Sequence, residues 1–445
     1  MMSHFSLGEE PDSPEEEEQQ LQVRTTTSTA SDDDDKKPQT KESDNHQTTN
    51  TTTSSLSLKL LIEQVSQDAD AADSDAWDVV RERCQSHPDE MSILDDDSSS
   101  QGQMMTKGQS VLHQLCATPN APDDVLQTVV KAYPQALVTQ EAEFGATPLH
   151  MLMWTTLRST SKLKLLLEHM EPQDLLLKNR FSGTALYSAC GMNATLETIQ
   201  LLVQKNPKIL LERTRDHSHT SLTALWDSHL QSIPGHMAIA RILKGGGEED
   251  DVFTTEPHFQ RFWSKVEYIA AESFQLSPDC PPIHRINNKT DPQPRDLVLL
   301  GLLQLRARIN AIKVALKFHP PWASIVDANG NTPLHLIVMR RPYRLKDHVE
   351  LISELLQVYP QAATLCNKQG DVPLLIGIRD KMAWKDGLSQ LVHANPEALL
   401  SIQDRETGLY PFLLAASQGG NVAVNTTYEL LLLKPDLVKD ALLVE

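Results

Sequence analysis

The sequence predicts an all-α solenoid, in which one helical unit repeats along most of the 445 residues. Two observations predict this fold class. A six-residue helix start recurs about every forty residues, and a proline ends an apolar helical run at a nearly constant distance after each start. A fixed period of this length is typical of proteins in which each unit buries its apolar face against its neighbours.

The clearest helix start is "GNTPLH" at residues 330–335. Its glycine permits a tight turn, Thr332 is suited to cap the helix, and Pro333 is tolerated at the first helical position, where no backbone N–H is needed. The pattern recurs, intact or weaker, as "GQSVLH" (108–113), "GATPLH" (145–150), "SGTALY" (182–187), "SLTALW" (221–226), "GDVPLL" (370–375) and "GLYPFL" (408–413).

The fifth residue of each copy is apolar, and we take it as the anchor of its unit. The anchors are Leu112, Leu149, Leu186, Leu225, Leu334, Leu374 and Phe412. Successive anchors lie 37 to 40 residues apart, except for one gap of 109 residues, which is close to three periods. The copies therefore belong to one repeated series.

The second feature is an apolar run with helical spacing that stops at a proline, through which a helix cannot easily continue. The runs are "LQTVVKAYPQAL" (126–137), "IQLLVQKNPKIL" (199–210), "ISELLQVYPQAA" (352–363), "LSQLVHANPEAL" (388–399) and "YELLLLKPDLV" (428–438). Each proline follows its anchor by 21 to 26 residues. This constant phase indicates one unit, composed of a turn, a short helix, a loop, a second helix and a stop.

With "TPLH" opening its first helix, this unit resembles the ankyrin repeat, a β-turn and two helices in about 33 residues. The resemblance covers roughly residues 75–445, and the motif is intact at 145–150 and 330–335. The units here are longer, their second helices end in Tyr-Pro or Asn-Pro, and the family's usual Gly-His between helices is missing. The resemblance implies a divergent, long-repeat solenoid of about seven or eight repeats.

We expect four segments along the chain. Residues 1–72 are predicted to be a disordered acidic tail, because 16 acidic and 5 basic residues accompany a single aromatic residue, Phe5. Residues 73–244 and 330–445 are expected to hold the N-terminal and C-terminal repeats, and a helix at 77–91 is expected to cap the first of them. Residues 245–329 are expected to hold a glycine-rich acidic loop, an extra helix and one degenerate repeat.

Charge and composition limit the classes of partner. The net charge of −20 at pH 7 disfavours nucleic-acid binding, which needs clustered Lys and Arg. No apolar stretch approaches the roughly 20 residues of a membrane span. The five cysteines are widely spaced and odd in number, which favours a reducing intracellular compartment, cytoplasmic or nuclear. We expect a monomer, with no metal and no cofactor.

Three histidines follow the anchors, namely His113, His150 and His335. The resemblance implies a structural role for them, because the family's histidine at this position hydrogen-bonds to neighbouring turns. A shared metal site is disfavoured, because successive repeats lie about 10 Å apart whereas zinc ligands lie about 2 Å from one ion. His217 and His219 could bind a metal weakly, but no cysteine or carboxylate completes a set.

We expect a non-catalytic scaffold or adaptor that binds a protein partner on its concave face. The resemblance implies that the residues flanking each turn glycine project from this face. They are Phe144, Ala146, Phe181, Gly183, Asn329, Asn331, Gln369, Asp371, Thr407 and Leu409. Phe144 and Phe181 are the strongest candidates, because aromatic residues dominate binding energy at interfaces; alternatively, both rings pack against their own loops. The alternative function is an enzyme, or enzyme subunit, with its site in residues 245–320.

Overall fold

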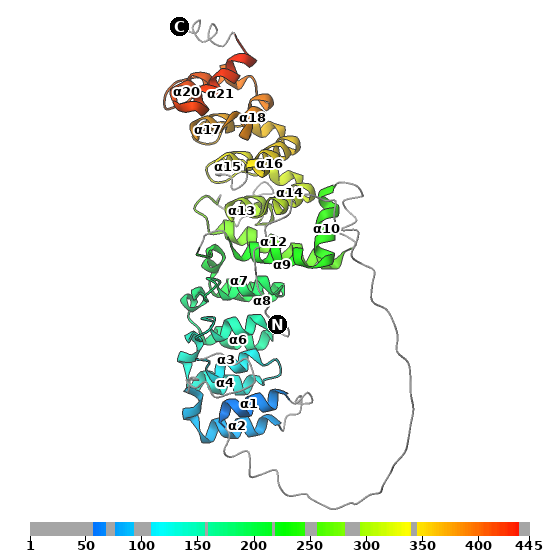
Figure 1. Ribbon diagram of the computed structural model, residues 1–445, viewed down its shortest axis with the longest axis vertical. Helices are drawn as coiled ribbons and strands as arrows, with labels where there is room; N and C mark the ends of the chain where they lie inside the picture. Colours follow the sequence, from blue (N-terminus) through cyan, green and yellow to red (C-terminus); the bar gives the residue numbers. More distant parts are fainter. Residues whose placement is uncertain are drawn as a thin grey trace, which may run out of the picture. The chain divides into compact units, whose positions relative to one another are not determined.

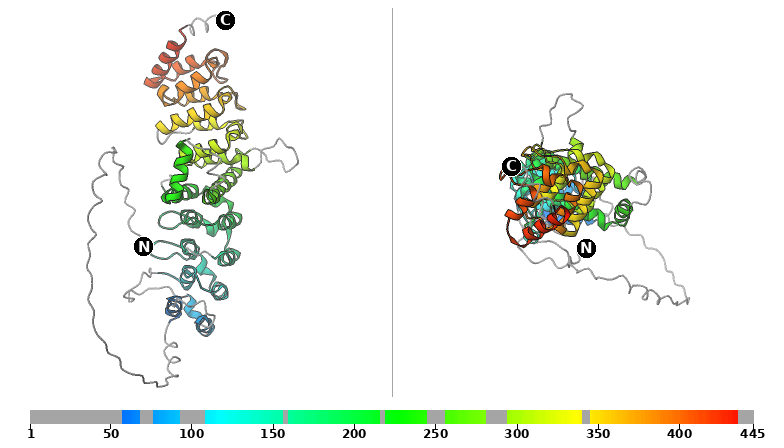
Figure 2. Two further views of the ribbon diagram at one scale, coloured as in Figure 1. Left: turned by 90° about the vertical axis from the view of Figure 1, so that its right-hand side faces the viewer. Right: turned by 90° about the horizontal axis from the view of Figure 1, so that it is seen from above.

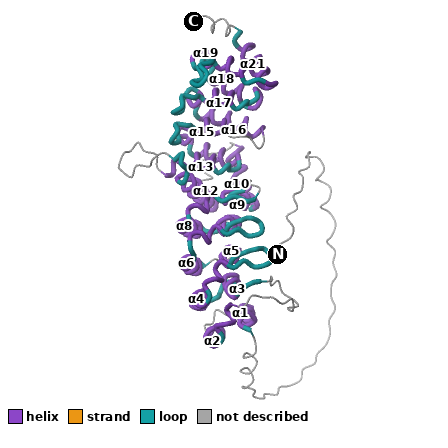
Figure 3. Tube along the Cα trace, turned by 90° about the vertical axis from the view of Figure 1, so that its left-hand side faces the viewer, coloured by secondary structure: helices purple, strands orange, loops and turns teal. Residues whose placement is uncertain are grey.

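The computed structural model describes residues 57–67, 76–92, 108–155, 159–215, 219–244, 256–280, 294–339 and 345–435. The chain divides into two units, Met1–Ser54 and Ser55–Glu445, and all described residues belong to the second. Within them the fold is all-α, as predicted, and the only bridge between extended residues pairs Arg213 with Thr220. Figure 3 shows this part as helices joined by loops.

Helix pairs follow one another in sequence order, from α1 and α2 to α20 and α21 (Figure 1). The first helices of the pairs are α3 (Val111–Ala117), α5 (Pro148–Trp154), α7 (Ala185–Gly191), α9 (Ser221–Gln231), α13 (Val298–Gln304), α15 (Pro333–Met339), α17 (Pro373–Arg379) and α20 (Pro411–Ser417). The second helices are α4 (Asp123–Ala132), α6 (Thr160–His169), α8 (Leu196–Lys205), α10 (Ile233–Lys244), α14 (Ile309–Phe318), α16 (Leu345–Val358), α18 (Leu388–Ala394) and α21 (Gly420–Leu433). These pairs match the predicted unit.

First helices pack on first helices, as in α3, α5, α7 and α9, and second helices pack on second helices, as in α4, α6 and α8. The side view of Figure 2 shows this layered order. The anchor leucines of the motif lie in the shared core, where Leu112, Leu149 and Leu186 are fully buried. Each pair therefore covers the apolar face of the next, as expected for a repeat that cannot bury its own core alone.

The prolines end the second helices as predicted. Pro134, Pro207 and Pro360 each open a short 3-10 helix directly after α4, α8 and α16, namely η3 (Pro134–Val138), η5 (Pro207–Leu211) and η8 (Pro360–Ala363). The others are η2 (Pro88–Ser92), η4 (Pro172–Leu176), η6 (Pro294–Leu297), η7 (Pro320–Ser324) and η9 (Trp384–Asp386), and the short α19 (Ala398–Ser401) follows Pro396. Proline suits the first position of such a turn because its missing N–H has no helical partner there.

The turns before six of the first helices (α3, α5, α7, α15, α17 and α20) each contain a left-handed backbone residue, a conformation that glycine adopts without steric cost. Gly108, Gly145, Gly330, Gly370 and Gly408 all have positive φ, between 62° and 87°. In the third repeat the same position is occupied by Ser182, with φ of 62°. The weaker motif "SGTALY" therefore keeps the turn geometry, although its glycine has moved one residue along the chain.

The register assigned to the fourth repeat was wrong. Helix α9 begins at Ser221 and is capped by the Thr220 side chain, so the residue equivalent to the other anchors is Leu222 rather than Leu225. Both leucines are buried, because they lie one helical turn apart on the same face. Because of this periodicity, the match of "SLTALW" to the motif placed the anchor one helical turn too far along the chain.

The predicted disordered tail is too long. Residues Leu58–Gln67 form helix α1, which pairs with α2 (Ala76–Ser86), and Leu58, Leu61 and Ile62 are buried. The Lys59 ammonium donates to the carbonyl of Gln109, and Gln114 Nε2 donates to the carbonyl of Lys59 at 2.9 Å. Averaging over the acidic tail concealed this short apolar run, whose face is covered by α2 and α3. Residues 1–56 lie outside the described part.

After α10, the described residues of the long gap between anchors form one helix pair and one extra helix. The pair is α13 and α14, and the extra helix is α12 (Pro257–Gln275), which packs between α9 and α13. The glycine-rich acidic loop expected at 245–251 lies outside the described residues, as does Ile283, which the sequence "CPPIHRI" (280–286) suggests as the anchor of the degenerate repeat. Ahead of that segment, the carbonyl of Asp279 accepts a hydrogen bond from Ala328 N at 2.7 Å, and its carboxylate accepts from Asn329 Nδ2 at 2.8 Å.

Candidate functional site

In five of the described turns, a polar side chain three or four residues before the left-handed residue accepts hydrogen bonds from the turn backbone. The Asp327 Oδ1 atom accepts hydrogen bonds from the backbone N of Asn329 and of Asn331, both at 2.8 Å. The equivalent acceptors in the other repeats are Glu141, Asn179, Asn367 and Asp404. Sequence analysis missed these residues, although a recurring Asp, Asn or Glu at this spacing is a readable signal for a turn.

Each motif histidine connects its own repeat to the next. The backbone N of Thr147 donates to His150 Nδ1 at 3.3 Å, and His150 Nε2 lies 3.1 Å from the carbonyl oxygen of Gly183. Because Nδ1 accepts, the ring proton resides on Nε2, which donates to that carbonyl. His113 reaches the Ala146 carbonyl at 3.0 Å in the same way, and His335 reaches the Asp371 carbonyl at 3.0 Å. These contacts support a structural role for all three histidines.

Burial lowers the pKa of His113 and of His150 to about 4, although the hydrogen bond to the next repeat's carbonyl opposes that shift. The pKa of His335 is also lowered, mainly by burial. All three are therefore neutral in the folded protein at pH 7. An unfolded histidine titrates near pH 6.5, so the stability that these neutral side chains contribute is complete above about pH 6.5. It decreases at lower pH, and for His113 and His150 it is lost as the pH falls towards about 4.

We expect His150→Ala and His335→Ala each to lower the free energy of unfolding by about 1 to 3 kcal/mol, because the carbonyl of the next repeat loses its donor. Urea denaturation at pH 7 and at pH 5 measures this effect, and each variant should lose part of the pH dependence. His236→Ala is the control, because His236 is exposed on α10. Unchanged midpoints, or tight stoichiometric zinc binding by the wild type, would contradict a structural role.

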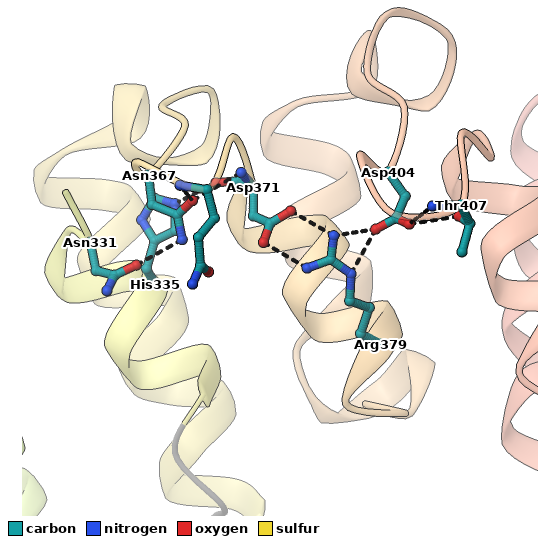
Figure 4. Close-up of polar contacts among 8 residues, drawn as sticks. Asn331, His335, Asn367, Asp371, Arg379, Asp404 and Thr407 are labelled. Carbon is teal, nitrogen blue, oxygen red and sulfur yellow. Dashed lines mark hydrogen bonds and ion pairs between the residues drawn. The ribbon is translucent and has the colours of Figure 1, made fainter. Parts of the chain in front are cut away.

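In the C-terminal repeats, an arginine joins two turns (Figure 4). The Arg379 guanidinium donates to both carboxylate oxygens of Asp371, at 2.6 and 2.7 Å, and its Nε donates to Asp404 Oδ1 at 2.7 Å. Burial raises the pKa of the Asp404 carboxyl, but hydrogen bonds from Thr407 and Arg379 outweigh burial and bring that pKa below its usual value. The two aspartates and the arginine thus connect successive repeats.

Four of the residues named as partner-binding candidates are buried, so the expectation that they project from the concave face is wrong. Ala146, Gly183, Asn331 and Asp371 all follow the left-handed residue. These residues hold successive repeats together. Ala146, Gly183 and Asp371 supply the backbone carbonyls that the three motif histidines contact. Asn331 Oδ1 accepts a hydrogen bond from Asn367 Nδ2 at 2.9 Å. The chain turns inward after the left-handed residue, so only the preceding residue projects from the turn.

The residues before the left-handed position do lie at the surface. Phe181, Asn329, Gln369 and Thr407 are exposed, and Phe144 is half-buried. Leu409, which follows the left-handed Gly408, is also half-buried. The Phe144 carbonyl accepts from Arg180 N at 2.7 Å, and the Asn329 carbonyl accepts from Lys368 N at 2.8 Å. These backbone contacts fix the position of each tip relative to the next repeat.

Two of these tips stack on each other. The rings of Phe144 and Phe181 have centroids 6.1 Å apart and an interplanar angle of 25°, and Phe181 remains 63% exposed. Trp154, at the end of α5, packs edge-on against Phe144 at 6.1 Å. Sequence analysis missed Trp154, which lies ten residues after Phe144 and joins it only through the fold of the repeat. We refer to Phe144, Trp154 and Phe181 as the aromatic patch.

The described part of the 245–320 segment contains one polar cluster at α12. Glu267 Oε1 accepts from Trp263 Nε1 at 2.9 Å and from Arg295 Nη2 at 3.2 Å, and it lies 3.4 Å from His319 Nε2. Burial raises the pKa of Glu267, but His319 and Arg295 more than offset it, so the pKa is lowered. The glutamate is thus an ionised partner that connects α12 to η6 and to the C-terminal end of α14.

Among the described residues, no group of three or more His, Cys, Asp or Glu is placed to hold a metal ion. His217 lies outside the described residues, so the weak site suggested for it and His219 is not visible. None of the helices in the described ranges has the length and apolar character that crossing a membrane requires.

The geometry defines an α-solenoid of stacked helix pairs. Within that class, three features resemble the ankyrin repeat in a longer form: the left-handed turn, the capped "TPLH" helix and the hydrogen bond from the motif histidine to the next repeat. No family model and no curated protein matches the sequence. Solved structures that match include the ankyrin repeat domain of Bcl-3, with 17% identity over 64% of this chain and 99% of that domain, at a TM-score of 0.29. So distant a match does not support any conclusion about this chain. The resemblance to the ankyrin repeat rests on the chain's own repeated motif.

Proposed function

We propose that this protein is a non-catalytic scaffold that binds a protein partner through its turn tips, with the aromatic patch as the energetic centre. The observation that carries the proposal is the stacking of Phe181 on Phe144, which come from successive repeats. Exposed apolar surface of this kind often marks a place where a partner binds. Aromatic residues are also enriched among the residues that contribute most of the binding energy at interfaces.

In this proposal, the buried turn residues and the motif histidines hold the backbone, and the exposed residues before the left-handed position contact the partner. Histidine bridges and turn acceptors hold the backbone, so the tips are positioned before the partner arrives. Tips presented rigidly lose little conformational entropy on binding, which favours affinity. The tips also differ in chemistry from repeat to repeat, with Phe181, Asn329 and Gln369 exposed at equivalent places, and such differences can give specificity.

We expect Phe144→Ala and Phe181→Ala each to weaken partner binding by about 30-fold, or roughly 2 kcal/mol, while the melting temperature stays near that of the wild type. A partner would first be isolated by affinity purification with the full chain, then titrated in purified form. Ile233→Ala is the control, because Ile233 is 81% exposed on α10, outside the aromatic patch. Unchanged affinity in both phenylalanine variants, or a matching loss of folding, would remove the aromatic patch as the binding site.

A further inference from the structure

The imidazole of His229 is buried where α9, α10 and α12 meet. Only 6% of this residue is exposed, and its ring stacks on Phe262 of α12 at a centroid distance of 3.6 Å and an interplanar angle of 4°. The ring of His258, also on α12, stacks on it at 5.2 Å. Helix α10 approaches closely as well, since a Cβ on Gly235 would lie 2.8 Å from His229 Nε2. Residues of three helices therefore enclose this histidine.

His229 differs from the three motif histidines in having no acceptor. Among the described residues, its buried Nε2 atom has no hydrogen-bond partner, whereas the Nε2 atoms of His113, His150 and His335 each contact a carbonyl oxygen of the next repeat. A buried polar atom without a partner destabilises the fold, and a phenylalanine would fill this place without one. Packing alone therefore does not explain the imidazole.

The surroundings of His229 oppose its protonation. Burial, together with His258 and Lys265 of α12, lowers the pKa of His229 to about 4, and no carboxylate of the described residues raises this pKa. Helix α10 contains no acidic residue, and the single acidic residue of α9, Asp227, binds Arg308 at 2.8 Å. A proton on His229 would therefore be a buried charge without a counter-ion, which is strongly unfavourable.

Helix α10 is the element that this contact can release. It lies at the side of the stack, against α9, α12 and α14 (Figure 1). Its titratable residues, His236, Arg241 and Lys244, are all exposed, so none of them shares the enclosed place of His229. On its inner face, Ile239 and Ile242 are buried. Release of α10 would expose these two side chains.

We propose that His229 forms an acid-sensitive contact, which holds α10 and the first turn of α12 against α9 while the imidazole is neutral and favours their release when the ring takes up a proton. The other helix pairs stay stacked, because their own contacts do not involve this ring. An exposed histidine has a pKa near 6.5, so release binds a proton and is favoured as the pH falls. The stability that the contact contributes is complete above about pH 6.5 and is lost as the pH falls towards 4.

Hydrogen exchange of the full chain at pH 8 and at pH 5, corrected for the intrinsic exchange rates, tests the proposal. In the wild type, the opening constant of α10 should be about 30-fold larger at pH 5, because the pKa of His229 is about 4 when enclosed and near 6.5 when exposed. In His229→Phe, which keeps the ring stack but cannot be protonated, the change should be less than about threefold. His236→Phe is the matched control, since His236 is exposed on the same helix, and it should behave as the wild type. No change in the wild type, or an equal change in His229→Phe, would overturn the proposal.

A smaller apolar variant and the titration of the ring itself keep the test decisive if His229→Phe does not fold. His229→Leu should lose the pH dependence of α10 exchange in the same way. In the wild-type chain with isotopically labelled histidine, magnetic resonance should show that the His229 ring stays neutral well below pH 6.5 and becomes protonated only as α10 loses its protection. A ring that is protonated near pH 6.5 while α10 remains protected would contradict the proposal, since the closed structure would then tolerate the charge.

Discussion

Replacing Gly301 with alanine is expected to be the most destabilising single substitution in the described part of the chain that removes no side chain. A Cβ at this position would lie 1.9 Å from the carbonyl oxygen of Ala270 and 2.6 Å from its carbonyl carbon. Both atoms belong to the backbone of α12, which cannot rotate away as a side chain could. Helices α12 and α13 would have to separate, and we expect a loss of about 3 kcal/mol or more in the free energy of unfolding.

Gly191→Ala is the control for this experiment. Gly191 is the last residue of α7, and a Cβ there would meet nothing within 4 Å. Alanine is a better helix former than glycine, so this variant should be neutral or slightly stabilising. Urea denaturation followed by circular dichroism compares the two. If Gly301→Ala unfolds at the wild-type midpoint, α12 does not cross α13 closely, and our account of the insertion is wrong.

Replacing Arg379 with methionine should have an effect of similar size, about 3 to 5 kcal/mol. The substitution keeps an apolar stem but leaves the Asp371 and Asp404 carboxylates buried without their cation, and the Asp404 side chain is only 1% exposed. Removing one member of a buried ion pair is costly because the remaining charge has lost its compensation. Thermal unfolding at pH 7 provides the measurement.

The pH dependence and two further variants distinguish charge from packing. The defect in Arg379→Met should shrink below about pH 4, where unpaired carboxyl groups become protonated. Adding Asp404→Asn should restore part of the stability, since it removes one uncompensated charge. Lys385→Met, which changes an exposed lysine in η9, should leave the melting temperature near the wild type. A defect of equal size at every pH would assign the effect of Arg379 to packing alone.

The repeat frame was predictable because its signals are local. The signals act through backbone geometry within a few residues. They are the proline at the first helical position, the prolines after the second helices and the capping threonines Thr147, Thr184 and Thr332. The same locality explains the error at α9, where Leu222 and Leu225 satisfy the motif equally well until the cap at Thr220 is seen.

The candidate site was only partly predictable. Phe144 and Phe181 could be named from their places beside the turn, but the burial of Ala146 and Asn331 depends on how the next repeat covers the turn. The contact of Trp154 with Phe144 likewise depends on where α5 ends relative to its own turn. Sequence patterns place residues along an element, and packing between elements determines which of them meet water.

The sequence by itself determined the helical repeat, its period, its start and stop residues and the histidines that recur in it, because each depends on short-range backbone preferences and a regular apolar pattern. Only the tertiary structure decided that α1 is part of the stack, that α12 crosses α13 at Gly301 and that Arg379 joins two turns. Those features depend on residues far apart in the chain that are brought together when the helix pairs stack, and no local pattern specifies them.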